Sequence, residues 1–193
     1  MFCYEWPDGI KANLVSEDNP NRCITNSDLE MAGLLMLWPV MENVCAVELE
    51  THAALFSDSQ PTMSWVMHMS SKSSDVAVQL LSALSLHLKM KGVSSLTTLL
   101  VPGKQNAMTD IPSRSFENVP QWHCKTDTDL LNFFNQKIPL TNQASWTVFR
   151  PTNAICTRVL SMLRMQVTTM GEWTILPKVG RSIRKNGVPS SDL

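Results

Sequence analysis

The stretch LFSDSQPTMSW, residues 55–65, determines how the sequence around it is interpreted. It predicts a short apolar strand that ends at Asp58 and continues directly into a helix. A carboxylate at the end of a buried strand costs free energy unless a cation or hydrogen-bond donors offset its lost hydration. In open sheets, functional sites gather at the strand ends. Asp58 is therefore the first candidate for chemistry.

A helix is predicted to begin at Ser27, because Ser27 and Glu30 have the spacing of a capping box. The apolar positions that follow at helical spacing, and are expected in the core, are Leu34, Leu37, Trp38 and Met41. Pro39 is expected to kink or shorten this helix. Glu30 either completes the cap or reaches towards the sheet end, and both interpretations stay open.

Helices and strands alternate through the rest of the first 116 residues. A helix at 75–91, ended by Gly92, places one apolar stripe on the core and His87 on the surface. The other expected elements are sheet fragments at 4–7 and 23–25, strands at 51–58 and 95–101, a helix at 61–69, a turn at 102–106, and a short helix that Asn106 caps and that carries Asp110. This order predicts an α/β layer fold with a mixed sheet.

Composition indicates a globular chain, with 44% hydrophobic and 17% charged residues among 193. No apolar run reaches the ~18 residues of a membrane span, and the start lacks a signal-peptide pattern. We therefore expect an intracellular protein of the cytoplasm or nucleus that is not secreted and binds no membrane. The five cysteines form no C-x-x-C pair, which argues against a zinc module or a disulfide framework.

Charge is unevenly distributed along the chain. Residues 1–60 carry ten acids and two bases, whereas residues 61–193 carry seven acids and fourteen bases. Such asymmetry is compatible with an acidic metal site beside a basic surface for nucleic acid. Residues 117–193 are predicted to form an extension with short helices, at about 127–135 and 156–165, and a basic tail at 178–185.

Three acids stand at comparable places: Glu30 at a helix start, Asp58 at a strand end, and Asp110 at the start of a helix after a strand. Carboxylates that are drawn together repel one another unless cations lie between them. Hard oxygen ligands favour Mg²⁺ or Mn²⁺, and two such ions about 3.5–4 Å apart promote phosphodiester cleavage.

The sequences around these acids are ITNSDLEMAG (24–33), FSDSQPTMSWV (56–66) and PGKQNAMTDIPSR (102–114). In this order they resemble the ribonuclease H domain of retrotransposon polyproteins, and the resemblance covers about residues 4–116. In that family the glutamate of E-x-x-A/G, the aspartate of S/T-D-S/N and the aspartate of G-x-x-N-x-x-A/T-D-x-x-S-R are metal ligands.

The resemblance implies a three-layer ribonuclease H-like fold and the hydrolysis of RNA in RNA–DNA hybrids. It implies that Glu30, Asp58 and Asp110 are the catalytic residues and the ligands of Mg²⁺ or Mn²⁺, and that Lys104, Asn106 and Arg114 contact nucleic acid. The implied partners are nucleic acid and the polyprotein neighbours, namely reverse transcriptase and an integrase or recombinase.

One departure concerns the family's fourth acid, an aspartate on the first strand, upstream of the segment that begins here at Glu5. The chain has no counterpart of it, so we expect the first strand or strands to be missing, a sheet edge to be uncovered and the two-metal site to be incomplete. Two alternatives to an active nuclease stay open. One is a non-catalytic remnant that binds nucleic acid through Lys89, Lys91, Lys104, Arg114 and the tail; the other is an unselected or protein-interaction fragment.

Overall fold

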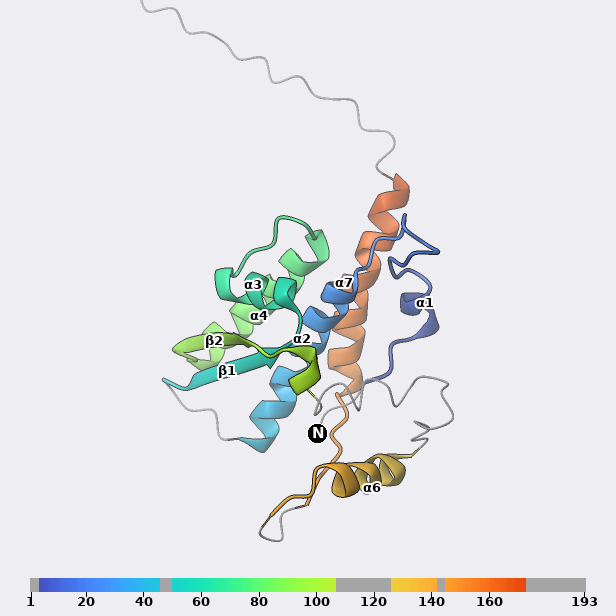
Figure 1. The fold of residues 1–193 in the computed structure, drawn as a ribbon. Helices are drawn as coiled ribbons and strands as arrows, with labels where there is room; N and C mark the ends of the chain where they lie inside the picture. Colours follow the sequence, from blue (N-terminus) through green and yellow to red (C-terminus); the bar gives the residue numbers. More distant parts are fainter. Residues whose placement is uncertain (1–3, 46–49, 107–125, 142–144, 173–193) are drawn as a thin grey trace, which may run out of the picture.

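The computed structural model describes residues 4–45, 50–106, 126–141 and 145–172 (Figure 1). The elements are α1 (Asp8–Lys11), α2 (Asn26–Val44), β1 (His52–Ser57), α3 (Gln60–His68), α4 (Asp75–Lys91), β2 (Ser95–Leu100), the 3₁₀ helix η1 (Gly103–Gln105), α6 (Asp127–Lys137) and α7 (Asn153–Glu172). The α/β class is thus confirmed, and β1, α3, α4 and β2 lie close to their predicted bounds. None of the helices in these ranges is both long and apolar enough to cross a membrane.

The sheet of the described residues consists of β1 and β2, which run parallel in a register that extends from His52 opposite Ser95 to Ser57 opposite Leu100. α3 and α4 form the crossover that parallel neighbours require. The mixed sheet expected from the sequence is not found in this part of the chain. Residues 4–7 form no strand, and Ile24 makes only an isolated parallel bridge with Leu14.

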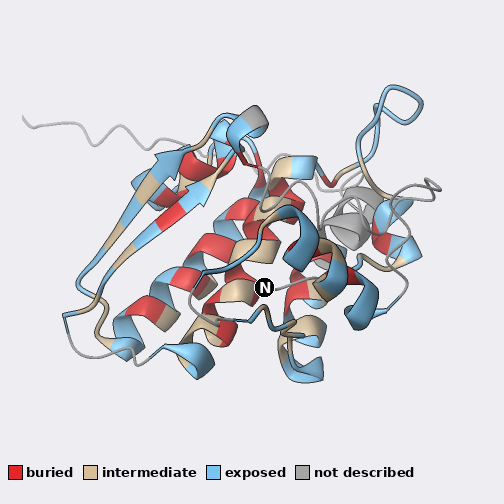
Figure 2. Cartoon of the chain, turned by 60° about the horizontal axis from the view of Figure 1, so that its bottom comes forward, coloured by how far each residue is buried: buried red, intermediate tan, exposed pale blue. Residues whose placement is uncertain are grey.

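The core is formed mainly by α2, α4 and α7, together with Leu55 of β1 (Figure 2). The predicted stripe of α4 is confirmed, because Ala77, Leu80, Leu81, Leu84 and Leu88 are all buried. α7 is longer than its predicted 156–165, and Val159 and Leu163 lie in the same core. The interval 117–193 therefore supplies a core helix in addition to any connecting segment.

α2 begins two residues earlier than predicted. Its N-cap is Thr25, whose side chain pairs with the backbone of Asp28, and Asp28 returns the bond to Thr25, so the capping box is Thr25/Asp28 and the Ser27/Glu30 assignment is wrong. This register turns Met31 and Leu35 into the core. Glu30 is thereby freed from any capping role.

Asp28 also joins α2 to α4. One carboxylate oxygen accepts from the Thr25 amide (2.8 Å) and the Thr25 hydroxyl (2.7 Å), and the other accepts a short hydrogen bond from the Ser74 hydroxyl. Ser74 is the N-cap of α4 and accepts from the Ala77 amide at 3.0 Å. A carboxylate with only 1% exposure is thus satisfied by donors at two helix N-termini, where negative charge is favourable.

Glu42 joins the other ends of the same two helices. Its Oε1 accepts from Trp38 Nε1 (3.0 Å) and contacts His87 Nε2 (2.7 Å), and its Oε2 lies 3.3 Å from Lys91 Nζ. His87, expected on the surface, is half-buried in this cluster. α2 continues through Pro39 to Val44, so the shortening expected at the proline is not found. α2 and α4 therefore run parallel, and side-chain contacts join them at both ends.

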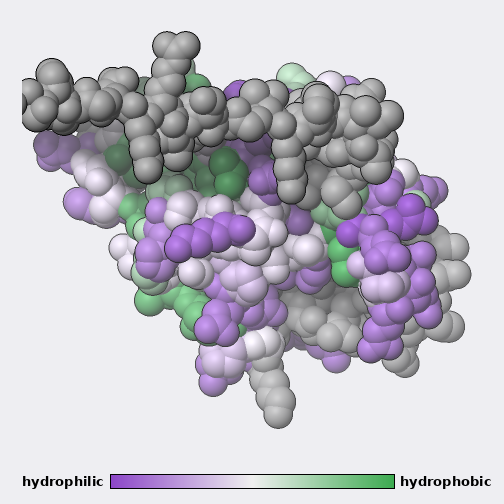
Figure 3. Space-filling model, turned by 90° about the horizontal axis from the view of Figure 1, so that it is seen from above, coloured by the Kyte–Doolittle hydropathy of each residue, from purple (hydrophilic) through white to green (hydrophobic). Residues whose placement is uncertain are grey.

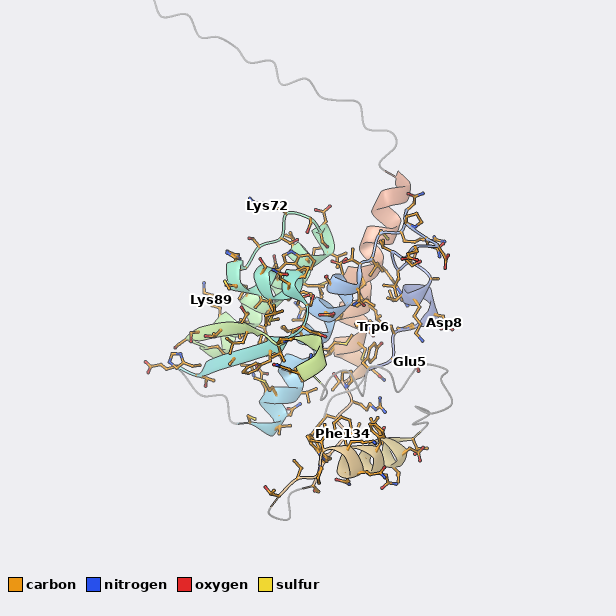
Figure 4. All side chains as sticks on the ribbon, in the orientation of Figure 1. Glu5, Trp6, Asp8, Lys72, Lys89 and Phe134 are labelled. Atoms are coloured by element: carbon orange, nitrogen blue, oxygen red, sulfur yellow. The ribbon has the colours of Figure 1, made fainter. Side chains whose placement is uncertain are left out.

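α6 forms a smaller cluster outside the main core. Phe134, labelled in Figure 4, is buried and meets the Trp146 ring edge-on at 5.1 Å between centroids. Trp146 Nε1 donates to the carbonyl of Ile138 at 2.9 Å. The amphipathic helix predicted at 127–135 is confirmed, with Thr126 and Asp129 as its capping box.

Replacing Asp28 with Asn should lower the free energy of unfolding by about 1–3 kcal/mol, because an amide nitrogen would face hydroxyl and amide donors in a buried place. Asp129→Asn is the matched control, since Asp129 closes the same kind of capping box but is exposed. It should cost about 0.5–1 kcal/mol. Urea unfolding of the two variants checks this; equal costs would contradict the joining role of Asp28.

Replacing Glu42 with Gln should lower the free energy of unfolding at pH 7 by about 2 kcal/mol. Burial raises the pKa of Glu42, but hydrogen bonds and charge from His87 and Lys91 outweigh it and leave the pKa lowered. The stabilisation is therefore present above the ordinary glutamate pKa and is lost as pH falls through the lowered value. Unfolding curves between pH 2 and 7 should show that the wild type loses free energy of unfolding as pH falls. The control Glu50→Gln should show the same loss, and Glu42→Gln should show a smaller one.

Candidate functional site

Asp58 lies where β1 turns into α3, as the sequence predicted. Ser59 is the N-cap of α3, with its hydroxyl oxygen 3.4 Å from the Thr62 amide, and Pro61 occupies the first turn. Asp58 itself is exposed. A Cβ placed on Gly103 would lie 3.4 Å from Asp58 Oδ2, so the end of β2 and the start of η1 approach this carboxylate.

Glu30 reaches the same place from the first turns of α2. Its Oε2 accepts a hydrogen bond from the hydroxyl of Ser57, the last residue of β1, at 3.2 Å. Its Oε1 accepts from Asn26 Nδ2 at 3.3 Å. The Ser57 hydroxyl in turn accepts from the Ser59 amide at 3.1 Å. Glu30 and the end of β1, 27 residues apart, are therefore held together by one serine.

Glu30 lies in an environment that disfavours its ionised form. Burial raises the pKa of Glu30, and the negative charge of Asp58 raises it further. Hydrogen bonds with Ser59 and Ser57 lower the pKa but do not cancel the increase. The ionised form of Glu30 is consequently held at a cost in free energy, which a cation between the two carboxylates would remove.

The remaining predicted site residues divide into two groups. Asn106 is buried at the end of η1, and its backbone amide donates to the carbonyl of Gly103 at 3.1 Å. Gly103 is the residue that lies beside Asp58. Lys104 lies within η1. Asp110 and Arg114 fall outside the described residues. Within the described ranges no group of three or more His, Cys, Asp or Glu residues is placed to hold a metal ion.

Sequence reasoning did not assign roles to Ser57 and Gly103. The serines beside Asp58 were visible, but only the structure shows that Ser57 donates to Glu30. Gly103 belongs to the PGKQN turn, and its closeness to Asp58 depends on the parallel pairing of β1 and β2.

The donor set fits one Mg²⁺ or Mn²⁺ ion. Magnesium is usually held by one or two carboxylates and keeps several waters, and Glu30 and Asp58 supply such a pair. Asp58 is exposed, so water can reach its carboxylate.

No protein-family description matches the sequence, and no curated protein or solved structure matches it either. The functional argument consequently depends on the motifs of the chain and on the geometry of Glu30 and Asp58.

Replacing Glu30 with Gln should stabilise the metal-free fold at pH 7, because it removes a buried charge whose pKa is raised. The sign follows from linkage: an acid with a raised pKa destabilises the fold above its ordinary pKa, and the penalty is relieved as pH falls. Melting curves in a chelator and at increasing Mg²⁺ measure both effects. The wild type should gain about 2.7 kcal/mol at a Mg²⁺ concentration 100 times the Kd, and Glu30→Gln should gain little.

Glu17→Gln, at an exposed acid outside the site, is the control and should respond to Mg²⁺ as the wild type does. An unchanged response of Glu30→Gln to Mg²⁺ would exclude Glu30 as a ligand.

Proposed function

We propose that the chain is a ribonuclease H-like domain derived from a retroelement, and that its site hydrolyses the RNA strand of RNA–DNA hybrids with Mg²⁺ or Mn²⁺. One observation carries the proposal: Glu30 of α2 accepts a hydrogen bond from Ser57, the last residue of β1 and the neighbour of Asp58, at the carboxyl end of a parallel strand pair. Two carboxylates at such a position are costly without a cation.

The sequence motifs support the same conclusion independently of the fold. The segments at 24–33, 56–66 and 102–114 stand in the order of the retrotransposon ribonuclease H motifs. The two motifs whose acids are described meet in space, although 27 residues separate Glu30 from Ser57. Only Glu30 is bonded to Ser57, and Asp58 follows that serine directly in sequence, so the fold brings the first motif to the start of the second.

Each residue has a proposed role. Glu30 and Asp58 hold the ion, Ser57 orients the Glu30 carboxylate, and Asp110 is the third proposed ligand. When bound, the ion supplies a more acidic water and neutralises charge on the phosphate. Lys104, Asn106 and Arg114 are proposed to contact the nucleic acid, and Gly103 lies beside Asp58.

The second candidate function is nucleic-acid binding without hydrolysis. It is favoured by exposed lysines in the described residues, among them Lys72 and Lys89. Figure 4 shows Lys72 and Lys89 on the side of α3 and α4, whereas Glu5 and Asp8 lie near α1. Lys91, one of the residues proposed to bind nucleic acid in this case, also takes part in the Glu42 cluster. Under either function the proposed neighbours in the parent polyprotein are a reverse transcriptase and an integrase or recombinase.

A labelled RNA–DNA hybrid tests the choice. The wild type should cleave its RNA strand only with Mg²⁺ or Mn²⁺, and Asp58→Asn should reduce the rate on the order of a hundredfold or more, because it removes a charge that holds the ion. Asp75→Asn, at an exposed acid in the first turn of α4, should cleave as the wild type does.

Salt-dependent binding of the hybrid without cleavage, from a folded sample, would replace the first proposal with the second. A folded sample that shows no cleavage and no binding of the hybrid would contradict both proposals.

A further inference from the structure

The outer edge of β1 has no paired strand in the described part of the chain. The carbonyls of Thr51 and Ser57 accept from Ser94 (3.0 Å) and Val101 (2.9 Å), so the odd-numbered residues of this segment direct their backbone groups towards β2. Backbone groups alternate sides along a strand, and His52, Ala54 and Phe56 therefore direct theirs to the opposite edge. No strand in the described ranges pairs with that edge.

The face of the sheet that points away from the helices is also uncovered. Phe56 is 60% exposed and its register partner Leu99 is 45% exposed. Figure 2 shows both strands mostly in the colours of exposed and intermediate residues, and hydrophobic patches reach the surface in Figure 3. β1 (HAALFS) contains no charged residue and no proline, the devices that usually protect an edge strand. A sheet of two strands is also short of the number that gives independent stability.

We propose that β1 pairs antiparallel with β1 of a second copy of this chain, so that two copies share one four-stranded sheet across a two-fold axis. Ala54 then lies on the axis opposite its own copy, and His52 lies opposite Phe56. Each of these residues directs its backbone groups to the free edge, so all three opposing pairs are hydrogen-bonded pairs, with about six bonds in total.

The sequence of β1 favours a second copy as the occupant, because the strand is complementary to itself. The small Ala54 side chains meet at the two-fold axis without crowding, and each Phe56 ring packs on a His52 imidazole of the other copy. His52 is hydrogen-bonded to Ser95 of β2, which holds the imidazole on the outer face. Isologous two-fold pairing satisfies both open edges at once. The edge of β2 is less suitable, since α3 packs against β2.

The charges that flank the paired segment give the pairing a distinctive salt dependence. Glu50 precedes β1 and Asp58 follows it, and antiparallel pairing brings the Glu50 end of one copy to the Asp58 end of the other. Both are acidic, so added salt should screen the repulsion and strengthen the dimer.

Sedimentation and light scattering of the full chain test the pairing, with Phe56→Lys against Leu99→Lys as the matched pair. Both variants place a lysine on the same exposed face, but only Phe56 lies on the pairing edge. The wild type and Leu99→Lys should dimerise, more strongly at high salt, and Phe56→Lys should remain monomeric.

Hydrogen exchange identifies the edge. The amides of His52, Ala54 and Phe56 should exchange on the order of tenfold more slowly at concentrations that favour the dimer, whereas those of Ala53 and Leu55 should not change. Ala54→Cys should form a disulfide between copies, because hydrogen-bonded opposite residues lie about 5.5 Å apart, within disulfide range; Thr97→Cys on β2 should not.

A monomer at every concentration up to about 1 mM would overturn the proposal, and would leave the edge open to a strand from another protein. A dimer that Phe56→Lys leaves intact, or in which the three amides gain no protection, would overturn it as well. These outcomes do not depend on Mg²⁺ binding or hydrolysis.

Discussion

The buried carboxylate of Asp28 is the interaction on which the rest of the arrangement depends. It is shared between the N-terminal turns of α2 and α4, and its bonds to Thr25 and Ser74 fix where both helices begin. The Glu42 cluster repeats the connection at the other end of α2, so that α2 cannot slide along α4. A related hydroxyl network ties in α3, because Thr62 donates to the Ser27 carbonyl at 3.1 Å. Three helix N-termini thus converge beside the end of β1.

This convergence determines the electrostatics of the site. Glu30 lies two residues after Asp28, and the start of α2 set by Asp28 leaves Glu30 free to accept from Ser57. The two acids differ in kind. Asp28 is fully satisfied by internal donors and serves packing, whereas Glu30 is half-buried beside the like charge of Asp58 and its pKa is raised. Stability comes from the first acid, and an affinity for cations is the expected consequence of the second.

Local sequence patterns predicted the elements well, and failed where distant residues decide. The α4 stripe and the stop at Gly92 follow from spacing and backbone preference, and both are found, Gly92 with φ of 69°. The start of α2 was misassigned because Thr25/Asp28 and Ser27/Glu30 both fit a capping pattern, and only the donor from Ser74, 46 residues away, distinguishes them. The local pattern predicts His87 on the surface, because its partner Glu42 lies 45 residues away in sequence and only the fold brings the two together. For the site, Asp58 and Glu30 were named from sequence, but their meeting through Ser57 required the fold.

The central claim is that Glu30 and Asp58 together bind a divalent cation. Paramagnetic broadening of amide resonances by Mn²⁺ tests it most directly, because the effect falls off steeply with distance from the ion. At substoichiometric Mn²⁺ the account predicts selective loss of the signals of Glu30, Ser57, Asp58 and Gly103, reversed by excess Mg²⁺, with the signals of α6 unchanged. Broadening that is uniform, or that centres on other acids while these four signals persist, would contradict it.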